Sequence, residues 1–164
     1  MITMGAVAPP GRWVLLAYRL PREPSTPRIA VWRKLKRLGV AQLLDGLVAL
    51  PLDSRNREQL EWLAEEIVEA GGEVSIWLAD SSTAAQEREI ASRLASAIAA
   101  QYAEVIGKAR AAAGKPLSQR RRTLARLRRE LARIRRRDYF PPAEREEADR
   151  AVEALAESVV ELAA

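Results

Sequence analysis

Val40-Ala-Gln-Leu-Leu-Asp-Gly-Leu-Val-Ala-Leu-Pro-Leu52 is the stretch that decides how the first half of this chain folds. It contains two short apolar runs, 40–44 and 47–52, on either side of Asp45-Gly46. An Asp-Gly pair between apolar runs favours a tight turn that joins antiparallel strands. The stretch therefore predicts a β-hairpin in the middle of the first eighty residues.

One helix is predicted on each side of the hairpin, because apolar residues recur there at helical spacing. In the preceding helix, residues 28–38, those on or beside one face are Ile29, Val31, Trp32, Leu35 and Leu38. In the following helix, which Asp53 or Ser54 can cap, they are Leu60, Leu63, Ile67 and, as a further candidate, Trp62. Gly39 and Gly71-Gly72 provide the C-terminal stops.

The outermost elements of this half are two predicted strands. Residues 13–20 form an apolar run that Pro21 stops, and in residues 73–79 Trp77 should lie on the face opposite Val74, Ile76 and Leu78. The order strand, helix, strand, strand, helix, strand predicts an α+β fold. We expect a ferredoxin-like βαββαβ plait over residues 12–80, with both helices on one face of an antiparallel sheet. Residues 1–11 are expected to be a disordered leader.

The second half contains no strand signal and predicts a three-helix extension over residues 81–164. An alanine-rich helix, capped by Asp80, Ser81 or Ser82, should run to about Ala113, where Gly114-Lys115-Pro116 breaks it. An arginine-rich helix is expected at 118–138. Pro141-Pro142 then opens an acidic helix at 142–164.

Charge is concentrated in one segment. The chain carries 27 basic and 22 acidic residues, for a net +5. Residues 118–137 hold ten arginines and one glutamate, which is +9 and leaves −4 for the rest. A localised positive field predicts a polyanionic partner.

The composition also excludes several classes of site. With no cysteine and no histidine, the chain cannot build a zinc–thiolate site or use histidine acid/base catalysis. We expect no cofactor and no metal, and only metals bound by carboxylates, such as magnesium, are left open. The sequence contains neither a signal-like leader nor an apolar run of membrane-spanning length, so we expect a cytoplasmic protein.

The arginine-rich helix divides into two faces. Leu124, Leu127, Leu131 and Ile134 recur at spacings of three, four and three and predict an apolar seam. The arginine stripe, on the opposite side, consists of Arg122, Arg126, Arg129, Arg133 and Arg136. At 1.5 Å per residue the stripe would span about 21 Å, enough to meet several backbone phosphates of duplex DNA. We therefore predict that the stripe binds DNA.

A second basic cluster, the first-helix cluster, could contribute to the same surface. It consists of Arg28, Arg33, Lys34, Lys36 and Arg37, of which the last four are the predicted DNA contacts. Lysine and arginine also commonly decorate the solvent face of a helix, so contact with DNA and simple solvation are both open.

Two other functions remain open at this point. The acidic helix could neutralise the stripe, which would make a protein-interaction or dimerisation module. Its acids are Glu144, Glu146, Glu147, Asp149, Glu153, Glu157 and Glu161. A magnesium-dependent nuclease would instead use Asp45, Asp53 or Asp80, although turns and caps favour aspartate anyway. Trp32, Trp62 and Trp77 are predicted to lie in the core or an interface rather than to stack on a ligand, while Trp13 could do either.

Three separated motifs are specific enough to compare with known families. They are Trp13-Val-Leu-Leu-Ala-Tyr-Arg-Leu-Pro-Arg-Glu-Pro-Ser25, Val31-Trp-Arg-Lys-Leu-Lys-Arg-Leu-Gly39 and Arg137-Asp-Tyr-Phe-Pro141. Together they resemble the N-terminal region of the ChrB family of chromate-resistance regulators. The resemblance implies a cytoplasmic, DNA-associated transcriptional regulator without enzymatic activity. A homodimer is expected from the sheet edges and the alanine-rich helix.

The resemblance also limits what can be carried over. A complete ChrB continues into a second domain for sensing, so chromate sensing is assigned to no residue here, and the sensor could be a separate protein. The plait also resembles PaaX-type repressors and the small CRISPR-associated ferredoxin-like nucleases. Where those nucleases have a metal-binding aspartate, this chain has Arg19 after Tyr18, which argues against nuclease activity.

Overall fold

The structure is a computed structural model that describes residues 13–164, so the predicted leader lies outside the described residues. The elements are β1 (Trp13–Arg19), α1 (Thr26–Leu38), β2 (Ala41–Leu44), β3 (Leu47–Pro51), α2 (Ser54–Glu69), β4 (Glu73–Ala79), α3 (Ala84–Ala112), α4 (Leu117–Arg135) and α5 (Glu144–Ala163). The chain divides into two compact units, one ending at Leu94 and the other comprising Ala95–Ala164. Each unit is described by itself.

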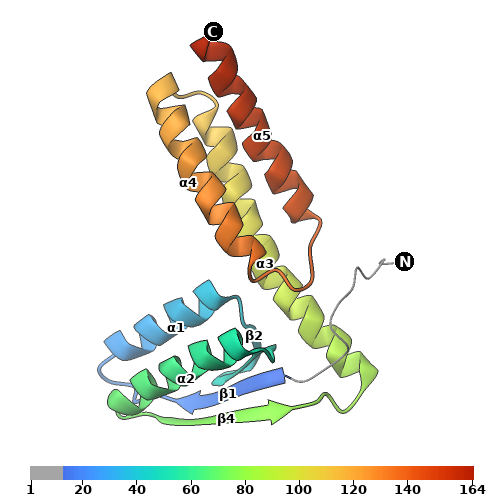
Figure 1. Cartoon of the computed structure of the whole chain (residues 1–164). Coiled ribbons are helices and arrows are strands. Elements are labelled where there is room, and N and C mark those ends of the chain that lie inside the picture. The colour runs from blue at the N-terminus through green and yellow to red at the C-terminus, as the bar shows by residue number, and fades with distance from the viewer. Residues whose placement is uncertain (1–12) are drawn as a thin grey trace. The chain divides into compact units, whose positions relative to one another are not determined.

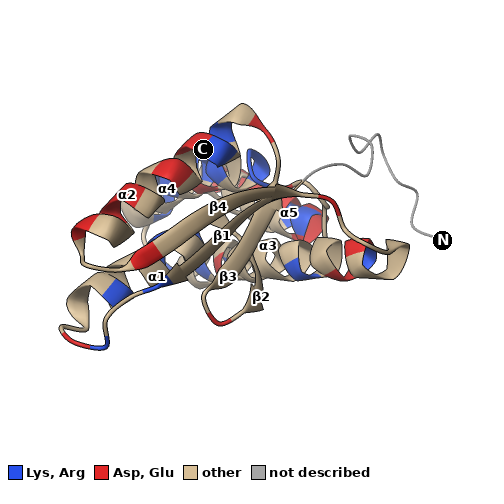
Figure 2. Ribbon diagram, turned by 90° about the horizontal axis from the view of Figure 1, so that it is seen from below, with Lys and Arg blue, Asp and Glu red and all other residues tan. Residues whose placement is uncertain are grey.

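The first unit is built on a four-stranded antiparallel sheet with the strand order β2-β3-β1-β4. Helices α1 and α2 lie on one face of this sheet (Figure 1). The strands carry few charged residues, as the view from below shows (Figure 2). The charged residues of the four strands are Arg19 and Glu73, and Nη2 of Arg19 lies 2.6 Å from Oε2 of Glu73. The prediction of an α+β fold with an antiparallel sheet is confirmed.

The hairpin between β2 and β3 turns at Asp45-Gly46, as predicted. Gly46 has a φ of +78°, which L side chains rarely adopt. Its carbonyl accepts a 2.8 Å hydrogen bond from the backbone N–H of Tyr18 in β1. A Cβ at this position would collide with the carbonyl oxygen of Tyr18. Glycine is therefore required both by the turn and by the close approach of β1.

The core of the sheet unit follows the predicted periodicity, except at the tryptophans. Val14, Leu16, Val48 and Leu50 share one sheet face by register, and Val31, Leu35, Leu60, Leu63 and Ile67 are the buried apolar residues of α1 and α2. Trp77 pairs with Leu15, so it lies on the opposite sheet face, as predicted. The exposed fractions of Trp32, Trp62 and Trp77 are 50%, 54% and 61%, so these residues do not belong to the core, and a role in an interface stays a prediction.

Trp77 is exposed because it lies on the opposite face of the sheet, whereas Trp32, Trp62 and Ile29, which is 45% exposed, are helical residues that differ from expectation for another reason. Each helix turns only a narrow stripe toward the sheet, and the residues beside that stripe remain in solvent. Trp13, by contrast, is only 4% exposed, and its indole N–H donates a 2.8 Å hydrogen bond to Oε2 of Glu87 in α3. The open question about Trp13 is therefore settled in favour of the core.

The start of α3 belongs to the sheet unit. Nη1 of Arg93 donates a 2.6 Å hydrogen bond to the carbonyl oxygen of Gln42 in β2. The helix begins at Ala84, and the side chain that accepts from its first turn is Thr83, whose Oγ1 lies 3.1 Å from the backbone nitrogen of Gln86. The predicted caps at residues 80–82 were therefore placed one to three residues too early.

The second unit contains the remainder of α3 together with α4 and α5. Its apolar core combines residues of all three helices, among them Tyr102, Leu127 and Leu155, each at most 2% exposed. Helix α4 ends at Arg135, three residues before the predicted end, and α5 begins at Glu144 rather than at 142. No helix in the described part of the chain combines the length and the apolar character needed to cross a bilayer.

Candidate nucleic-acid interface

The sequence of α4 fixes which of its sides faces the protein. Leu124, Leu127, Leu131 and Ile134 are 8%, 0%, 5% and 2% exposed and belong to the core of the helical unit. Burial of this seam turns the opposite side of the helix to solvent. The predicted seam is confirmed.

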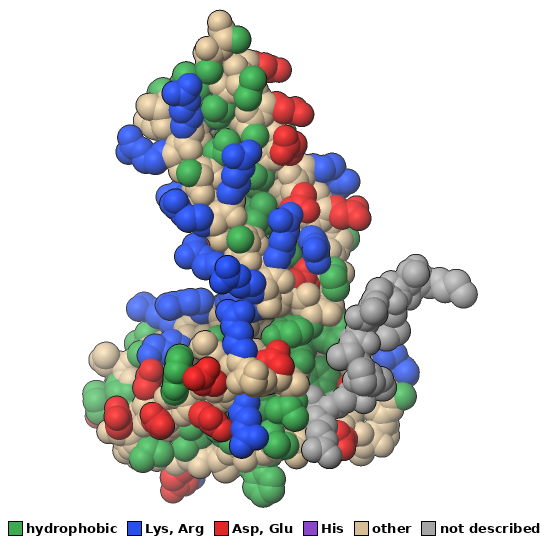
Figure 3. Space-filling model, viewed as in Figure 1, with side chains coloured by type: hydrophobic (Ala, Val, Ile, Leu, Met, Phe, Trp, Pro, Cys, Tyr) green, Lys and Arg blue, Asp and Glu red, His purple; other side chains and the backbone are tan. Residues whose placement is uncertain are grey.

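The arginine stripe lies on that solvent side. Arg122, Arg126, Arg129, Arg133 and Arg136 are all exposed. Basic side chains gather along this helix in the space-filling view (Figure 3). Among residues 13–164, none of the five side chains forms an ion pair or a hydrogen bond. The stripe is therefore a row of uncompensated positive charges within the described structure.

Other arginines of the same segment do have partners. Arg135 pairs with Asp149 of α5. Nε of Arg120 donates a 2.7 Å hydrogen bond to the carbonyl oxygen of Lys115, and Nη2 of Arg137 donates to Gln101 at 3.2 Å. The arginines that hold α4 in place are thus different from those of the stripe.

The ion pairs that the acidic helix α5 forms within the described chain are made with residues outside the stripe. Glu147 pairs with Arg110 of α3 at 2.9 Å, and Glu146 lies 4.0 Å from Arg150 of its own helix. The ion pair found between α4 and α5 among the described residues is Arg135–Asp149. An internally salt-bridged helix pair, one of the alternatives above, therefore does not account for the stripe.

The segment that follows α4 contains a buried carboxylate. The side chain of Asp138 has no exposed surface, and its Oδ2 accepts a 2.8 Å hydrogen bond from the hydroxyl of Tyr102. Nη1 of Arg145 lies 3.5 Å from the same oxygen. Burial raises the pKa of the Asp138 carboxyl, although Tyr102 and Arg145 both act to lower it. The pKa of Tyr102 is also raised, mainly by burial and to a lesser extent by its hydrogen bond to Asp138.

This network was not predicted from the sequence. Its one visible signal is a single tyrosine, Tyr102, within the alanine-rich helix. Because Tyr102 comes from α3 and Arg145 from α5, Asp138 connects the end of α4 to both neighbouring helices. We infer that the network fixes the position of α4, and with it the stripe.

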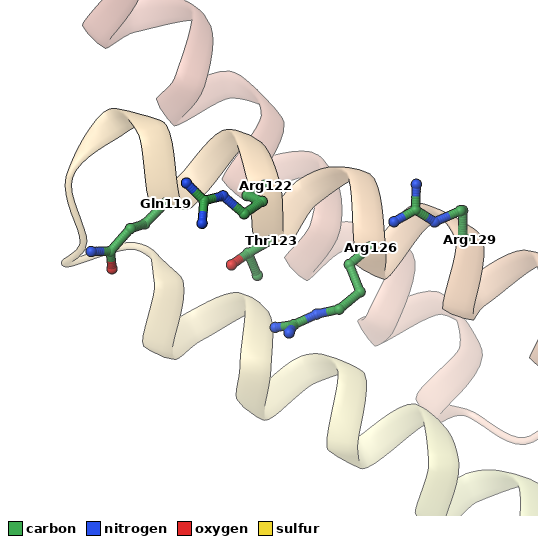
Figure 4. A pocket seen from close by; sticks show the side chains of 5 residues that line it. All are labelled: Gln119, Arg122, Thr123, Arg126 and Arg129. Atoms are coloured by element: carbon green, nitrogen blue, oxygen red, sulfur yellow. The ribbon is translucent and has the colours of Figure 1, made fainter.

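A hollow of about 280 Å³ lies along the first half of α4. Its lining residues are Gln119, Arg122, Thr123, Arg126 and Arg129. Figure 4 shows Arg126 extending toward α3, with Gln119 and Thr123 facing the same space. The sequence predicted the three arginines, but not that Gln119 and Thr123 would join them, because neither belongs to the stripe.

The first-helix cluster is partly engaged within the sheet unit. Nζ of Lys34 lies 2.5 Å from Oε1 of Glu66 in α2, and Nζ of Lys36 lies 4.4 Å from the centre of the Trp32 ring. Arg33 and Arg37 are exposed. Two of the four predicted cations therefore already have partners inside the protein.

The three aspartates of the nuclease alternative remain at turns and caps. Asp45 lies in the hairpin turn, and Asp80 follows β4. Oδ1 of Asp53 accepts a 2.6 Å hydrogen bond from the backbone nitrogen of Asn56 and caps α2. In the part of the chain that the structure describes, no group of three or more acidic side chains is placed to hold a metal ion.

Comparison with known proteins gives two similarities. A family model described as "Protein ChrB, N-terminal" matches residues 28–164, which include both basic clusters. Protein ChrB of Cupriavidus metallidurans is 33% identical over 97 residues, covering 59% of this chain and 29% of that protein. The matched stretch therefore amounts to less than a third of the relative's length.

Proposed function

Since this chain belongs to the family of ChrB N-terminal regions, we propose that it is the DNA-binding module of a chromate-resistance regulator and has no enzymatic activity of its own. The observation that carries the proposal is the arginine stripe, which has no ion-pair partner among residues 13–164 and consists of Arg122, Arg126, Arg129 and Arg133 of α4 and Arg136 at its C-cap. Arginine suits this role because its planar guanidinium binds phosphate through two hydrogen bonds and remains charged at any physiological pH.

The stripe fits phosphate contact better than contact with an acidic helix of the same chain. Its five guanidinium groups repeat over about 21 Å of helix, and a DNA duplex presents one charge about every 1.7 Å of its axis. The buried seam and the Asp138 network hold α4 in a fixed orientation, which reduces the conformational entropy lost on binding. The stripe would supply affinity and register rather than base recognition.

The sheet unit supports the same family assignment. We also propose that the unit is a ferredoxin-like plait, which is supported by its strand order β2-β3-β1-β4 and by the position of α1 and α2 on one face of the sheet. The first-helix cluster is a second DNA-contact candidate, carried mainly by Arg33 and Arg37, because Lys34 and Lys36 are already engaged. The protein would act in the cytoplasm.

We further propose that the regulator is a homodimer and works with a sensor supplied by another domain or another protein. The outer strand β4 offers a sheet edge for pairing, and its Trp77 and Leu78 are 61% and 44% exposed, whereas carbonyl oxygens of the other outer strand, β2, already accept hydrogen bonds from Arg93. Sedimentation equilibrium of the chain checks this part, with twice the monomer mass as the expected result.

DNA binding is tested by fluorescence anisotropy with a labelled duplex at 100 mM salt. In one variant the five stripe arginines become glutamine, which keeps helix propensity and leaves the seam intact. In the control variant, five exposed arginines elsewhere become glutamine, so the net charge is the same. These are Arg22, Arg55, Arg57, Arg88 and Arg150.

We expect the stripe variant to bind the duplex at least about 100-fold more weakly than the unaltered chain, because each lost phosphate contact forfeits counterion release. The control variant should lose far less. An equal loss in both variants would mean that only net charge matters. Failure of the unaltered chain to bind at low salt would exclude the proposal and favour an acidic protein partner.

The absence of enzymatic activity needs its own experiment. Incubating the chain with single-stranded and duplex DNA and magnesium should leave both intact. Cleavage that disappears when Asp45, Asp53 or Asp80 is replaced by alanine would restore the nuclease alternative.

A further inference from the structure

The hollow beside the first half of α4 combines three cations with two neutral hydrogen-bonding groups. Arg126 extends toward α3 on the side of Thr123 and Gln119, which supply a hydroxyl and an amide, and the guanidinium groups of Arg122 and Arg129 border the hollow and point away from α3 (Figure 4). No carboxylate belongs to its lining. All five side chains come from one helix, and the buried seam of that helix holds them in register.

The charges in this hollow call for an anion. Three arginines lie within eight residues, about 10 Å of helix, and none has an ion-pair or hydrogen-bond partner among the described residues. Like charges at this spacing repel one another. The hollow also flanks the first turns of α4, where the helix dipole adds positive potential. A bound anion would offset both the repulsion between the arginines and the positive potential of the helix dipole.

The size and lining of the hollow define the class of anion. Its volume of about 280 Å³ lies at the lower limit of pockets that take drug-sized molecules, and its lining lacks the apolar side chains that such ligands need. Guanidinium groups match the oxygens of a tetrahedral oxyanion through paired hydrogen bonds. The hydroxyl of Thr123 and the amide of Gln119 can donate to the remaining oxygens.

We propose that this hollow is a seat for one tetrahedral oxyanion, supplied either by a backbone phosphate of DNA or by a free inorganic anion. In the first case the proposal rests on the DNA-binding function and deepens it, because one phosphate is fixed in the hollow. Arg133 and Arg136 would meet the phosphates that follow. Thr123 is then a specificity residue, since its hydroxyl distinguishes a seated oxyanion from diffuse attraction to positive charge.

Titration of the full chain with inorganic phosphate tests the seat directly. Heteronuclear NMR follows the backbone amides of Gln119 and Thr123 and the Nε–H groups of the three arginines. Sodium chloride at equal ionic strength is the reference. We expect saturable shifts with phosphate and sulfate at these groups, and only small linear shifts with chloride.

Three variants identify the residues responsible. Arg126→Gln and Thr123→Val should each weaken phosphate binding at least about fivefold, whereas Thr123→Ser, which keeps the hydroxyl, should bind like the unaltered chain. Arg128→Gln is the matched control, because Arg128 is exposed on the same helix but outside the hollow. It should change phosphate binding less than twofold. Circular dichroism confirms that each variant is folded.

Duplex binding in phosphate and in chloride at equal ionic strength distinguishes the two sources. If phosphate raises the dissociation constant of the duplex, and Thr123→Val does the same, the DNA backbone occupies the seat. If phosphate saturates the hollow but leaves duplex binding unchanged, the seat belongs to a free anion.

The seat and the proposed function can fail separately. Saturable phosphate binding in a chain that binds no duplex would remove the DNA-binding function and leave the seat. Duplex binding that is unaffected by Thr123→Val, together with no saturable phosphate shift, would overturn the seat and leave the DNA-binding function.

Discussion

The hydroxyl of Tyr102 in α3 donates a 2.8 Å hydrogen bond to Oδ2 of Asp138, the carboxylate that follows α4. Tyr102 has no exposed surface, and neither does the side chain of Asp138. Arg145 at the start of α5 reaches the same oxygen. One buried polar contact thus joins three helices at the end of the stripe.

Removing the Tyr102 hydroxyl should destabilise the helical unit. Tyr102→Phe keeps the ring but leaves a buried carboxylate without its shortest hydrogen bond, and hydrogen bonds to charged groups are worth about 1.5–3 kcal/mol. We expect the free energy of unfolding to fall by about 2 kcal/mol in urea denaturation. Ser158→Ala is the control, since the Ser158 hydroxyl bonds only to a carbonyl of its own helix, and a loss under about 0.5 kcal/mol is expected. An equal loss of unfolding free energy in Tyr102→Phe and Ser158→Ala would contradict a stabilising role of the hydrogen bond between Tyr102 and Asp138.

Asp138 should also leave a signature in the pH dependence of stability. Burial raises its pKa in the folded chain above the unfolded value of about 3.9. The folded state therefore binds the proton of Asp138 more tightly than the unfolded state does. The resulting stabilisation is fully present below pH about 3.9 and is lost as the pH rises through the pKa of Asp138 in the folded chain. Between pH 4 and 7, the free energy of unfolding of the unaltered chain should fall relative to that of Asp138→Asn.

Urea denaturation of both chains across that range measures the difference. A difference that is flat, or that changes in the opposite direction, would show that the pKa of Asp138 is not raised by folding.

Two glycines should respond in opposite ways to alanine. At Gly46 the positive φ and the collision with the carbonyl oxygen of Tyr18 predict a loss of at least about 2 kcal/mol in the sheet unit. At Gly107, within α3, an added Cβ meets no atom within 4 Å, so alanine should stabilise the helical unit by about 0.5–1 kcal/mol. Hydrogen exchange reports the stability of each unit separately. A harmless Gly46→Ala would mean that β1 does not approach the hairpin turn as described.

The comparison of sequence with structure shows what periodicity can and cannot predict. The seam of α4 and its arginine stripe follow from spacing alone, because a helix with one apolar side must turn that side inward. Trp62 illustrates the limit, since periodicity identifies the middle of the buried face but not how far burial extends to its sides. Trp13 was uncertain for a related reason, because its partner Glu87 lies 74 residues away.

The hollow and the Asp138 network illustrate a second limit. Thr123 and Gln119 are not part of any charge pattern, although a helical spacing of three residues places Gln119 beside Arg122 and Thr123 beside Arg126. Asp138 was placed at the end of the arginine helix, but α4 ends at Arg135 and leaves Asp138 free to turn inward. Contacts of this kind depend on tertiary packing, which local spacing does not encode.

Glu130 offers a test of local charge. It is the one acid of α4, and it pairs with Lys108 at 3.0 Å. Glu130→Gln should strengthen duplex binding a few-fold by removing the negative charge among the arginines, with a stability loss within about 1 kcal/mol. Glu147→Gln also removes one charge and one ion pair, but from α5, and should change the affinity less. Equal effects would indicate that net charge alone governs binding.

The most direct test of the central claim is the salt dependence of duplex binding. If the five stripe arginines contact phosphate, the logarithm of the association constant should fall with the logarithm of salt concentration at a slope of about −4.5. Arg129→Gln should make the slope shallower by about 1, while Arg128→Gln, its exposed neighbour outside the stripe, should leave it nearly unchanged. A slope near zero, or one that Arg129→Gln does not alter, would contradict the account.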